Sequence, residues 1–245
     1  MKLKNAPVVE VVIGAQFSES ALPNQLIFDF YQKIRNQFPL IQEHPPLLSI
    51  IEKINEKNEN YLTQNILSRK FFLTQDQTKL IQIQPNRLLL NWRKNTENTE
   101  YPHFNNVLNE FLNIYTKINQ IMQIDNYLNQ LEVTYVDHII LEDFDKVDFN
   151  LTGILSVYNF SRTVKNFEGQ ISFPIGSING NIILNIKNAI RNSDQKKLFV
   201  VETTCRGFNQ AYSIQKWFDL AHNELVSFFE EILTPLTKSK WGYTK

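Results

Sequence analysis

Two long amphipathic stretches, 102–122 and 213–234, restrict the folds open to this chain more than any other sequence feature. In each stretch apolar side chains recur every three or four residues, which is the spacing of one helical face. The first stripe is Phe104, Leu108, Phe111, Tyr115, Ile118 and Met122, and the second is Ile214, Phe218, Ala221, Leu225, Phe228 and Ile232. Pro102 and Ser213 are residue types common at helix starts. Each predicted helix therefore needs an apolar surface to cover.

Runs of predicted strands precede both helices and supply that surface. Apolar–polar alternation and turn residues predict strands within 7–20 and at 66–74, 79–84 and 87–93 before the first helix. The same signals predict strands at 131–141, 152–160, 167–174, 181–190 and 197–206 before the second. A further amphipathic helix is predicted to start near Ala21, after a Ser20 cap. The polar stretch 51–60 is predicted to be a loop or a short exposed element.

This order of elements predicts an α+β protein with two antiparallel sheets, each packed by a long amphipathic helix. The two halves, 1–142 and 143–245, follow a similar order, which suggests a diverged internal duplication. No residue-level repeat accompanies that similarity. We expect the halves to associate tightly, with a single domain as the alternative, and the seam to lie at 142–150.

Charge and cysteine content narrow the class of protein. The chain of 245 residues has 25 Lys plus Arg and 25 Asp plus Glu, so no global field gathers nucleic acid or an anionic membrane. The one cysteine, Cys205, cannot form an internal disulfide, which is typical of a reducing compartment. No apolar run resembles a signal peptide or reaches the ~18 residues that span a bilayer. We therefore expect a cytoplasmic protein without a membrane partner.

Familiar catalytic and cofactor motifs are absent from the sequence. It has no GxxxxGK[ST], GxGxxG, HExxH, GxSxG or CxxC, which argues against P-loop ATPases and GTPases, Rossmann enzymes, zincins and α/β-hydrolases. We expect no metal and no cofactor. Asp219 and His222 are close enough on the last helix to touch, but a metal site would need a further ligand from elsewhere. An active site assembled from scattered residues stays open.

The strongest candidate binding residues lie on the predicted strands of the first half. In "NRLLLNWR" the alternation places Arg87, Asn91 and Arg93 on one strand face, opposite the apolar residues. Glu10 and Gln16 mark the less apolar face of the first strand. Arginines beside amides can hold a carboxylate, a phosphate or an acidic partner. The alternative is a solvated face whose charges discourage edge pairing.

Three residues are candidates for acid–base chemistry: Asp137, His138 and Glu202. Asp137 falls on the more apolar face of its strand, where an unpaired carboxylate is costly or becomes protonated. His138 points to the other face, so the two neighbours cannot pair. An enzyme would place these titrating groups in a cleft between the halves. In the simpler alternative Asp137 is bonded to backbone or to an arginine.

Four segments in order, "PVVEVVIGAQF", "LIQIQPNRLLLNWR", "LEVTYVDHI" and "WFDLAHNELVSFFEEILT…WG", resemble a sporadically distributed bacterial family of uncharacterised proteins of about this length. The resemblance spans nearly the whole chain, and it implies no catalytic residues. Asp137 stands where the family pattern implies Asn, which argues against an indispensable acid. Patchy distribution implies an accessory protein of a mobile or defence-related locus that works with a partner encoded nearby or as a homo-oligomer.

These observations favour a non-enzymatic binding or accessory protein that acts through a protein partner or a small anion. An enzyme with a dispersed acid–base site between the halves is the alternative. A nucleic-acid-binding protein is the third hypothesis, because "NWRKN" and "KSKWGYTK" mix basic and aromatic residues.

Overall fold

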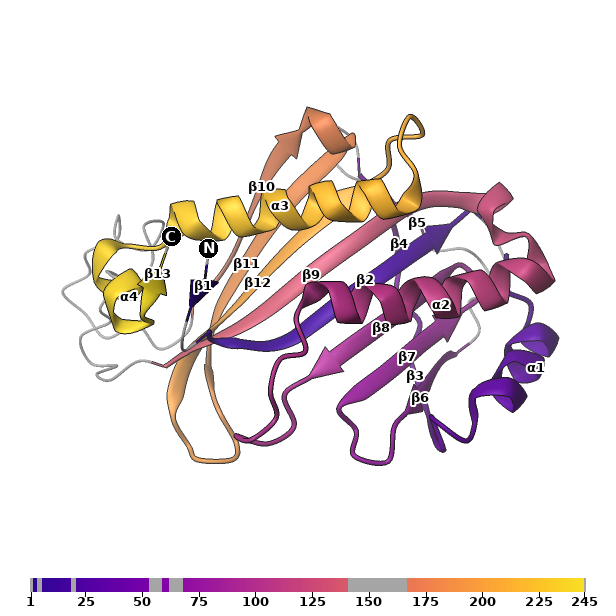
Figure 1. Cartoon of the computed structure of the whole chain (residues 1–245), viewed down its shortest axis with the longest axis horizontal. Helices are drawn as coiled ribbons and strands as arrows, with labels where there is room; N and C mark the ends of the chain where they lie inside the picture. The colour runs from indigo at the N-terminus through magenta and orange to yellow at the C-terminus, as the bar shows by residue number, and fades with distance from the viewer. Residues whose placement is uncertain are drawn as a thin grey trace.

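One antiparallel sheet dominates the computed structural model, which describes residues 2–3, 6–18, 21–52, 59–61, 68–140 and 167–244. Nine strands of the described residues form this sheet in the order β10-β11-β12-β9-β2-β8-β7-β6-β3. Their bounds, in that order, are Glu168–Ile175, Gly180–Ile190, Lys197–Gly207, Leu128–Ile140, Val8–Phe17, Arg87–Arg93, Lys79–Gln84, Arg69–Leu73 and Leu40–His44. Figure 1 shows the sheet running behind the two long helices.

The long helices α2 (Phe104–Met122) and α3 (Ile214–Ile232) lie side by side on one face of the sheet (Figure 1). The helix α2 contacts β2 and β8, and α3 contacts β9 and β12. The apolar stripes predicted from the sequence are the surfaces that these helices bury, since the main core cluster joins Phe111 and Phe218 to Ile13, Leu90 and Val133 of the sheet. Burial of such side chains is the main favourable contribution to folding.

Shorter elements complete the helical side and the ends of the chain. The helix α1 (Asn24–Ile34) covers the same face near β6, where Tyr31 stacks on Phe72 with ring centroids 4.8 Å apart. The helix α4 (Pro235–Lys240) follows α3, and β1 (Lys2–Leu3) pairs with β13 (Tyr243–Thr244), which brings the two ends of the chain together. None of the described helices combines the length and apolar character needed to cross a membrane.

The α+β class is correct, but the prediction of two sheets is wrong. The central strands β2 and β9 pair along almost their whole length, for example Ile13 with Val133, so the strands of both halves belong to one sheet. The sequence could not show this pairing, because a strand's apolar face does not identify its neighbour. The predicted strand at 152–160, the seam at 142–150 and the boundary between residues 142 and 143 lie outside the described residues.

The two halves of the sheet nevertheless share a topology. In each half the first strand (β2 or β9) is central, the last strand (β8 or β12) pairs with it, and the preceding strands continue outward. A helix of 19 residues then follows, α2 in one half and α3 in the other. Duplication as the origin of this correspondence stays a prediction.

The start and end of each long helix have local causes. Ser213 caps α3 as predicted, because its hydroxyl accepts a hydrogen bond from the Lys216 amide at 3.2 Å. The helix α2 ends at Gln123, whose left-handed φ of 50° turns the chain out of the helix. The predicted cap of the first helix, Ser20, lies outside the described residues, and α1 begins after Pro23.

Candidate functional site

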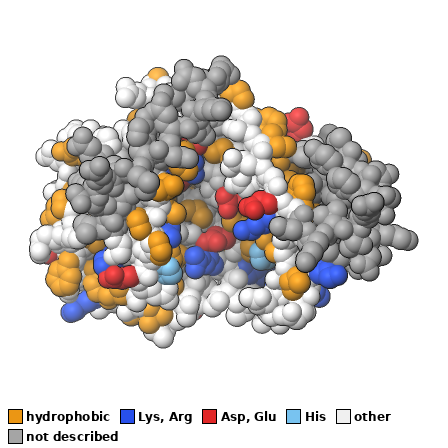
Figure 2. Space-filling view, turned by 180° about the vertical axis from the view of Figure 1, so that it is seen from behind, with side chains coloured by type: hydrophobic (Ala, Val, Ile, Leu, Met, Phe, Trp, Pro, Cys, Tyr) orange, Lys and Arg blue, Asp and Glu red, His pale blue; other side chains and the backbone are white. Residues whose placement is uncertain are grey.

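The sheet face turned away from α2 and α3 carries a continuous set of polar side chains, which we call the polar face. Its residues are Glu10, Gln16, Arg69, Gln82, Gln84, Arg87, Asn91, Arg93, Gln130, Glu132, Thr134, Asn181, Glu202, Thr204 and Arg206. Figure 2 shows this face, with acidic and basic side chains gathered at its centre. Ten of these fifteen are buried, among them Gln16, Arg87, Asn91 and Glu132, so the face is more than a solvated surface.

Strand register explains why these side chains meet. Side chains directly opposite one another in adjacent strands lie on the same face and touch. Arg87 lies opposite Gln16, and Arg93 lies opposite Glu10, on the paired strands β8 and β2. Arg206 lies opposite Glu132 on β12 and β9. The strand pairing therefore assembles a polar cluster from positions far apart in the chain.

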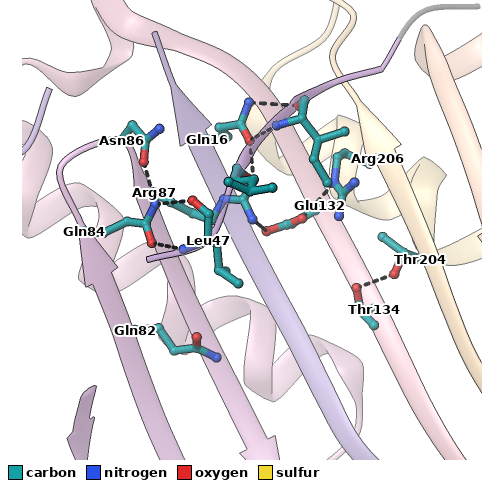
Figure 3. Close-up of polar contacts among 12 residues, drawn as sticks. Gln16, Leu47, Gln82, Gln84, Asn86, Arg87, Glu132, Thr134, Thr204 and Arg206 are labelled. Atoms are coloured by element: carbon teal, nitrogen blue, oxygen red, sulfur yellow. Dashed lines mark hydrogen bonds and ion pairs between the residues drawn. The ribbon is translucent and has the colours of Figure 1, made fainter. Parts of the chain in front are cut away.

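A buried ion network occupies the centre of the polar face (Figure 3). Glu132 lies between two arginines, with its Oε2 2.9 Å from Arg206 Nε and its Oε1 4.0 Å from Arg87 Nη1. Arg206 Nη1 also contacts Glu52 Oε1 at 2.9 Å, and Asn181 donates to the second oxygen of Glu52 at 2.9 Å. Burial alone would raise the pKa of Glu132, but the two arginines outweigh burial and hold its pKa below the ordinary value. Glu132 is therefore a charged, structurally committed carboxylate.

Residues 47–52, which we call the strap, cross the polar face and include β4 (Ser49–Ile51). Gln84 both donates to the Leu47 carbonyl at 3.0 Å and accepts from the Leu47 amide at 2.9 Å. Gln16 makes the same pair of hydrogen bonds with the main chain of Ile50, at 3.0 and 3.3 Å. Arg87 donates to the Leu48 carbonyl at 3.3 Å. The polar face thus holds an extended segment through its main chain (Figure 3).

A second chain of hydrogen bonds runs along the polar face from Arg69 on β6 to Glu10 on β2. Arg69 donates to Gln82 at 2.7 Å, Gln82 donates to Asn91 at 2.8 Å, and Asn91 donates to Glu10 at 2.5 Å. Arg93 contacts the same Glu10 oxygen at 2.9 Å. The Gln82 and Asn91 amides therefore form a chain of hydrogen bonds that begins at the cation Arg69 and ends at the anion Glu10. The carboxylate of Glu10 is already paired with Arg93, so it does not neutralise Arg69.

The network therefore has more cations than anions. Its arginines are Arg69, Arg87, Arg93 and Arg206, and its carboxylates are Glu10, Glu52 and Glu132. Arg69 has no carboxylate partner among the described residues; its guanidinium instead lies over the Phe71 ring, 4.7 Å from the centroid. The Nε atoms of Arg69 and Arg87 are buried without a hydrogen-bond partner in the described part of the chain. Burial and then the charges of Arg87 and Arg93 lower the pKa of Arg69, yet an arginine stays protonated at neutral pH.

The five residues predicted to bind, Glu10, Gln16, Arg87, Asn91 and Arg93, all belong to this network. Sequence reasoning missed Arg69, Glu132, Arg206 and Glu52 as members. Glu132 and Arg206 occupy alternate positions opposite apolar residues on predicted strands, so the same alternation could have indicated them. Glu52 lies in a polar stretch that gave no strand signal.

The predicted catalytic residues do not form one site. Asp137 lies on the helical face beside Tyr101 and Tyr135, whereas His138 and Glu202 lie on the polar face of their strands. Glu202 accepts a hydrogen bond from Asn185 at 3.2 Å. Two cavities formed by described residues, one lined by Trp92 and Glu110 and the other by Gln37 and Thr74, do not include Asp137, His138 or Glu202 in their linings.

Asp137 belongs to a buried cluster of titratable side chains beneath α2 and α3. The Tyr135 hydroxyl is 2.9 Å from His222 Nδ1 and 3.4 Å from the Tyr101 hydroxyl, and His222 stacks on Phe104 at 4.0 Å. Burial raises the pKa of Asp137 to about 7, raises that of Tyr101 to about 12 and lowers that of His222 to about 4. Asp137 is therefore the member of this cluster that titrates near neutral pH.

Among the described residues, no three His, Cys, Asp or Glu side chains lie close enough together to hold a metal ion. Comparison of the sequence with models of known protein families finds no match, and no curated protein sequence matches it. The bacterial family indicated by the four segments therefore stays a prediction. The function has to be argued from the polar face itself.

Proposed function

We propose that this protein is a non-enzymatic binding protein whose polar face holds an anionic group of a partner, either a carboxylate of a protein or a small anion. The observation that carries the proposal is Arg69. It is a partly buried cation without a carboxylate partner among the described residues, and its Nε lacks a hydrogen-bond acceptor there. A bound carboxylate or phosphate would supply both the charge and the acceptor.

The energetics of burial support an anion at this position. A buried donor without an acceptor costs about 1–3 kcal/mol, more when it is charged. Arg87 and Arg93 add positive potential at Arg69, as their effect on its pKa shows. Arg87 is covered by the strap, whereas Arg69 is only partly buried. Arg93 is also partly exposed, but it is paired with Glu10, so Arg69 is the partly exposed arginine of the network that has no carboxylate partner among the described residues.

The distribution of charge favours a local anionic group over a long polyanion. The whole chain is formally neutral, so it offers little of the extended positive potential that nucleic-acid binding uses. The enzyme alternative has less support, because Asp137 lies on the face opposite His138 and Glu202.

Native mass spectrometry of the tagged protein, purified gently from its host, tests the proposal when wild type is compared with Arg69→Gln. We expect wild type to carry a stoichiometric protein companion or a bound anion, and Arg69→Gln to lose it. Lys70→Gln is the matched control. Lys70 is the next residue of the same strand and pairs with Glu43, so this substitution also removes one positive charge but leaves Arg69 in place.

The control variant should retain whatever wild type carries. A companion that remains at full occupancy on Arg69→Gln would overturn the proposal, and so would wild type that runs as the bare chain. Inorganic phosphate provides an independent probe. It should raise the thermal midpoint of wild type and of Lys70→Gln, but not that of Arg69→Gln.

A further inference from the structure

The strap is held by side chains that are complementary to a peptide main chain. A glutamine side chain presents one carbonyl acceptor and one amide donor, as a peptide group does. Gln84 pairs in this way with Leu47, and Gln16 pairs with Ile50. In the amide orientation that satisfies both groups, Gln130 donates to the Ile50 carbonyl at 3.1 Å and accepts from the Glu52 amide at 2.7 Å. These hydrogen bonds go to main-chain groups, so they recognise an extended main chain whatever its side chains are.

The length of the strap fits the surface it crosses. Gln84 is on β7 and Arg206 is on β12, which is four strands further along the sheet. Four strand spacings of about 4.8 Å make about 19 Å, and the six residues from Leu47 to Glu52 span about 17 Å when extended, at about 3.4 Å for each of the five steps between them. Long side chains close the remaining distance. An extended segment can thus reach from one end of the glutamine series to the buried arginine at the other.

The end of the strap supplies an acidic side chain that the polar face binds. The Glu52 carboxylate is fully enclosed, with 0% side-chain exposure, and it contacts Arg206 Nη1 and Asn181 Nδ2 at 2.9 Å each. This pocket for a carboxylate lies two residues beyond Ile50, which two glutamines hold. The arrangement therefore specifies an extended peptide with an acidic residue two positions after its central anchor.

Anchoring by side chains distinguishes the strap from the strands of the sheet. The strand β4 is not a member of the nine-stranded sheet and pairs only with β5 (Glu59–Tyr61) among the described strands. The contacts that the described residues show between the strap and the polar face are hydrogen bonds from side chains of the sheet and the Glu52 ion pair, and Leu48 is 43% exposed. A competing segment that makes the same hydrogen bonds can replace it residue for residue.

We propose that the polar face is a peptide-binding surface, whose ligand is an extended segment of a partner protein with an acidic side chain that occupies the Arg206–Asn181 pocket. The strap holds this surface in the free protein as an internal stand-in for that segment. The inference rests on the proposed function and names the ligand class. Arg69 lies on β6, one strand beyond Gln84, where residues preceding the Leu47 position of such a ligand would pass.

The test uses full-length protein and a fluorescein-labelled peptide with the sequence of 46–53, PLLSIIEK. A second peptide carries Gln in place of its Glu. The protein variant is Glu52→Gln, which weakens the strap's own contact with Arg206 and vacates the charge site. Glu43→Gln is the matched control, because Glu43 is an exposed carboxylate at the sheet edge, paired with Lys70.

Fluorescence anisotropy should show about tenfold tighter binding of the glutamate peptide to Glu52→Gln than to wild type or to Glu43→Gln. On Glu52→Gln the glutamine peptide should bind about tenfold more weakly than the glutamate peptide. Ile50→Pro provides a second variant with a loosened strap, since proline lacks the main-chain N–H that donates a hydrogen bond to Gln16 Oε1. It should also bind the glutamate peptide more tightly than wild type, which keeps the test decisive if Glu52→Gln does not fold.

Equal affinity for the two peptides would overturn the inference, and so would absence of binding to both loosened variants at about 1 mM peptide. The proposed function fails separately. If Arg69→Gln loses the native companion but neither wild type nor the variants bind the peptide, the proposed anion binding is supported and the proposed peptide ligand is refuted. If the peptide binds as expected but Arg69→Gln keeps its companion, the proposal that Arg69 holds the partner's anionic group is refuted.

Discussion

Changing Asp137 to Asn should stabilise the protein at neutral and alkaline pH, although Asp137 is a buried polar residue. The Asp137 side chain is part of the helical face, and the residue is only 4% exposed. Its pKa is raised from 3.8 to about 7 because burial removes water from the charged form. Asparagine has nearly the same shape and carries no charge.

The magnitude follows from linkage between protonation and folding. A folded-state pKa about three units above the unfolded value, at about 1.4 kcal/mol per unit, corresponds to about 4 kcal/mol. Because the folded-state pKa is raised, the proton binds the folded state more tightly. The stability contribution is complete below the unfolded value near 4 and is lost as pH rises through about 7. Wild type therefore loses up to about 4 kcal/mol over this range, and Asp137→Asn does not.

Urea unfolding of wild type and Asp137→Asn at pH values from 5 to 8, which bracket the folded-state pKa of about 7, measures this difference. Tyr101 and His222, with pKa values of about 12 and about 4, do not titrate in this window. Between pH 5 and 8 the advantage of the variant should grow by about 2–3 kcal/mol, which is the part of the ~4 kcal/mol that is lost above pH 5. Any fixed cost of placing the amide would shift all points equally, so the slope is the diagnostic quantity.

Asp194→Asn should behave in the opposite sense and serves as the control. Arg191 lowers the pKa of Asp194 through hydrogen bonds to this exposed carboxylate. Its contribution is present above the unfolded pKa of about 3.8 and is lost only as pH falls below that value, so the deficit of Asp194→Asn should stay constant from pH 5 to 8 and shrink in more acid solution. A stability difference between wild type and Asp137→Asn that does not change with pH would refute the reasoning.

Three further predictions concern other buried positions. Glu132→Gln leaves two buried arginines without their shared counter-charge and should cost about 3–5 kcal/mol of unfolding free energy, measured in urea. Gly14→Ala places a methyl group against the Leu89 side chain, and 3.1 Å from the Glu132 side chain, so it should cost about 1–3 kcal/mol in the same assay. Cys205 is fully buried with a raised pKa, so a thiol reagent should label it only after denaturation, and rapid labelling of native protein would contradict that placement.

Local periodicity was enough to predict most elements but not their pairing. The helix predicted over 102–122 is found at Phe104–Met122, and the strands predicted at 79–84 and 87–93 are found at those residues. Hydrophobic spacing reports which face of an element is buried, and that information is local. The pairing of β2 with β9 depends on residues distant in the chain, and it decides whether there are one or two sheets. The sequence carries no local signal for it.

The missed elements are short, and their sequences obscure the pattern. The strand β3 (Leu40–His44) lies between prolines in "FPLIQEHPPLL", which predicts the end of a helix rather than an edge strand. The strand β5 overlaps the polar stretch 51–60, predicted to be a loop or a short exposed element, and β4 overlaps the start of that stretch by one residue. Gln16 and Gln130, on other strands, hydrogen-bond to β4 at Ile50, and Gln84 holds Leu47 just before it. The sequence of β4 itself does not indicate these hydrogen bonds from other strands.

The candidate site could be predicted only in part for the same reason. Alternation along β8 indicated Arg87, Asn91 and Arg93 as one face, which the structure shows. The counter-charges that make this face a buried network come from Glu132 and Glu52, whose positions depend on sheet register and on the strap. A charge can be placed on a face from sequence, but its partner requires the tertiary structure.

The composition of the polar face itself argues for binding rather than for stability alone. A buried ion pair loses hydration that its attraction only partly restores, and apolar residues of similar volume are often as stable or more so. The helical face of the same sheet is filled with such apolar residues, including Val11, Ile13 and Val133. The polar face instead holds several buried charges, a series of glutamines that bind main chain and an arginine without a carboxylate partner in the described residues. Stability does not require that combination, whereas the recognition of an extended acidic segment that we propose would use every part of it.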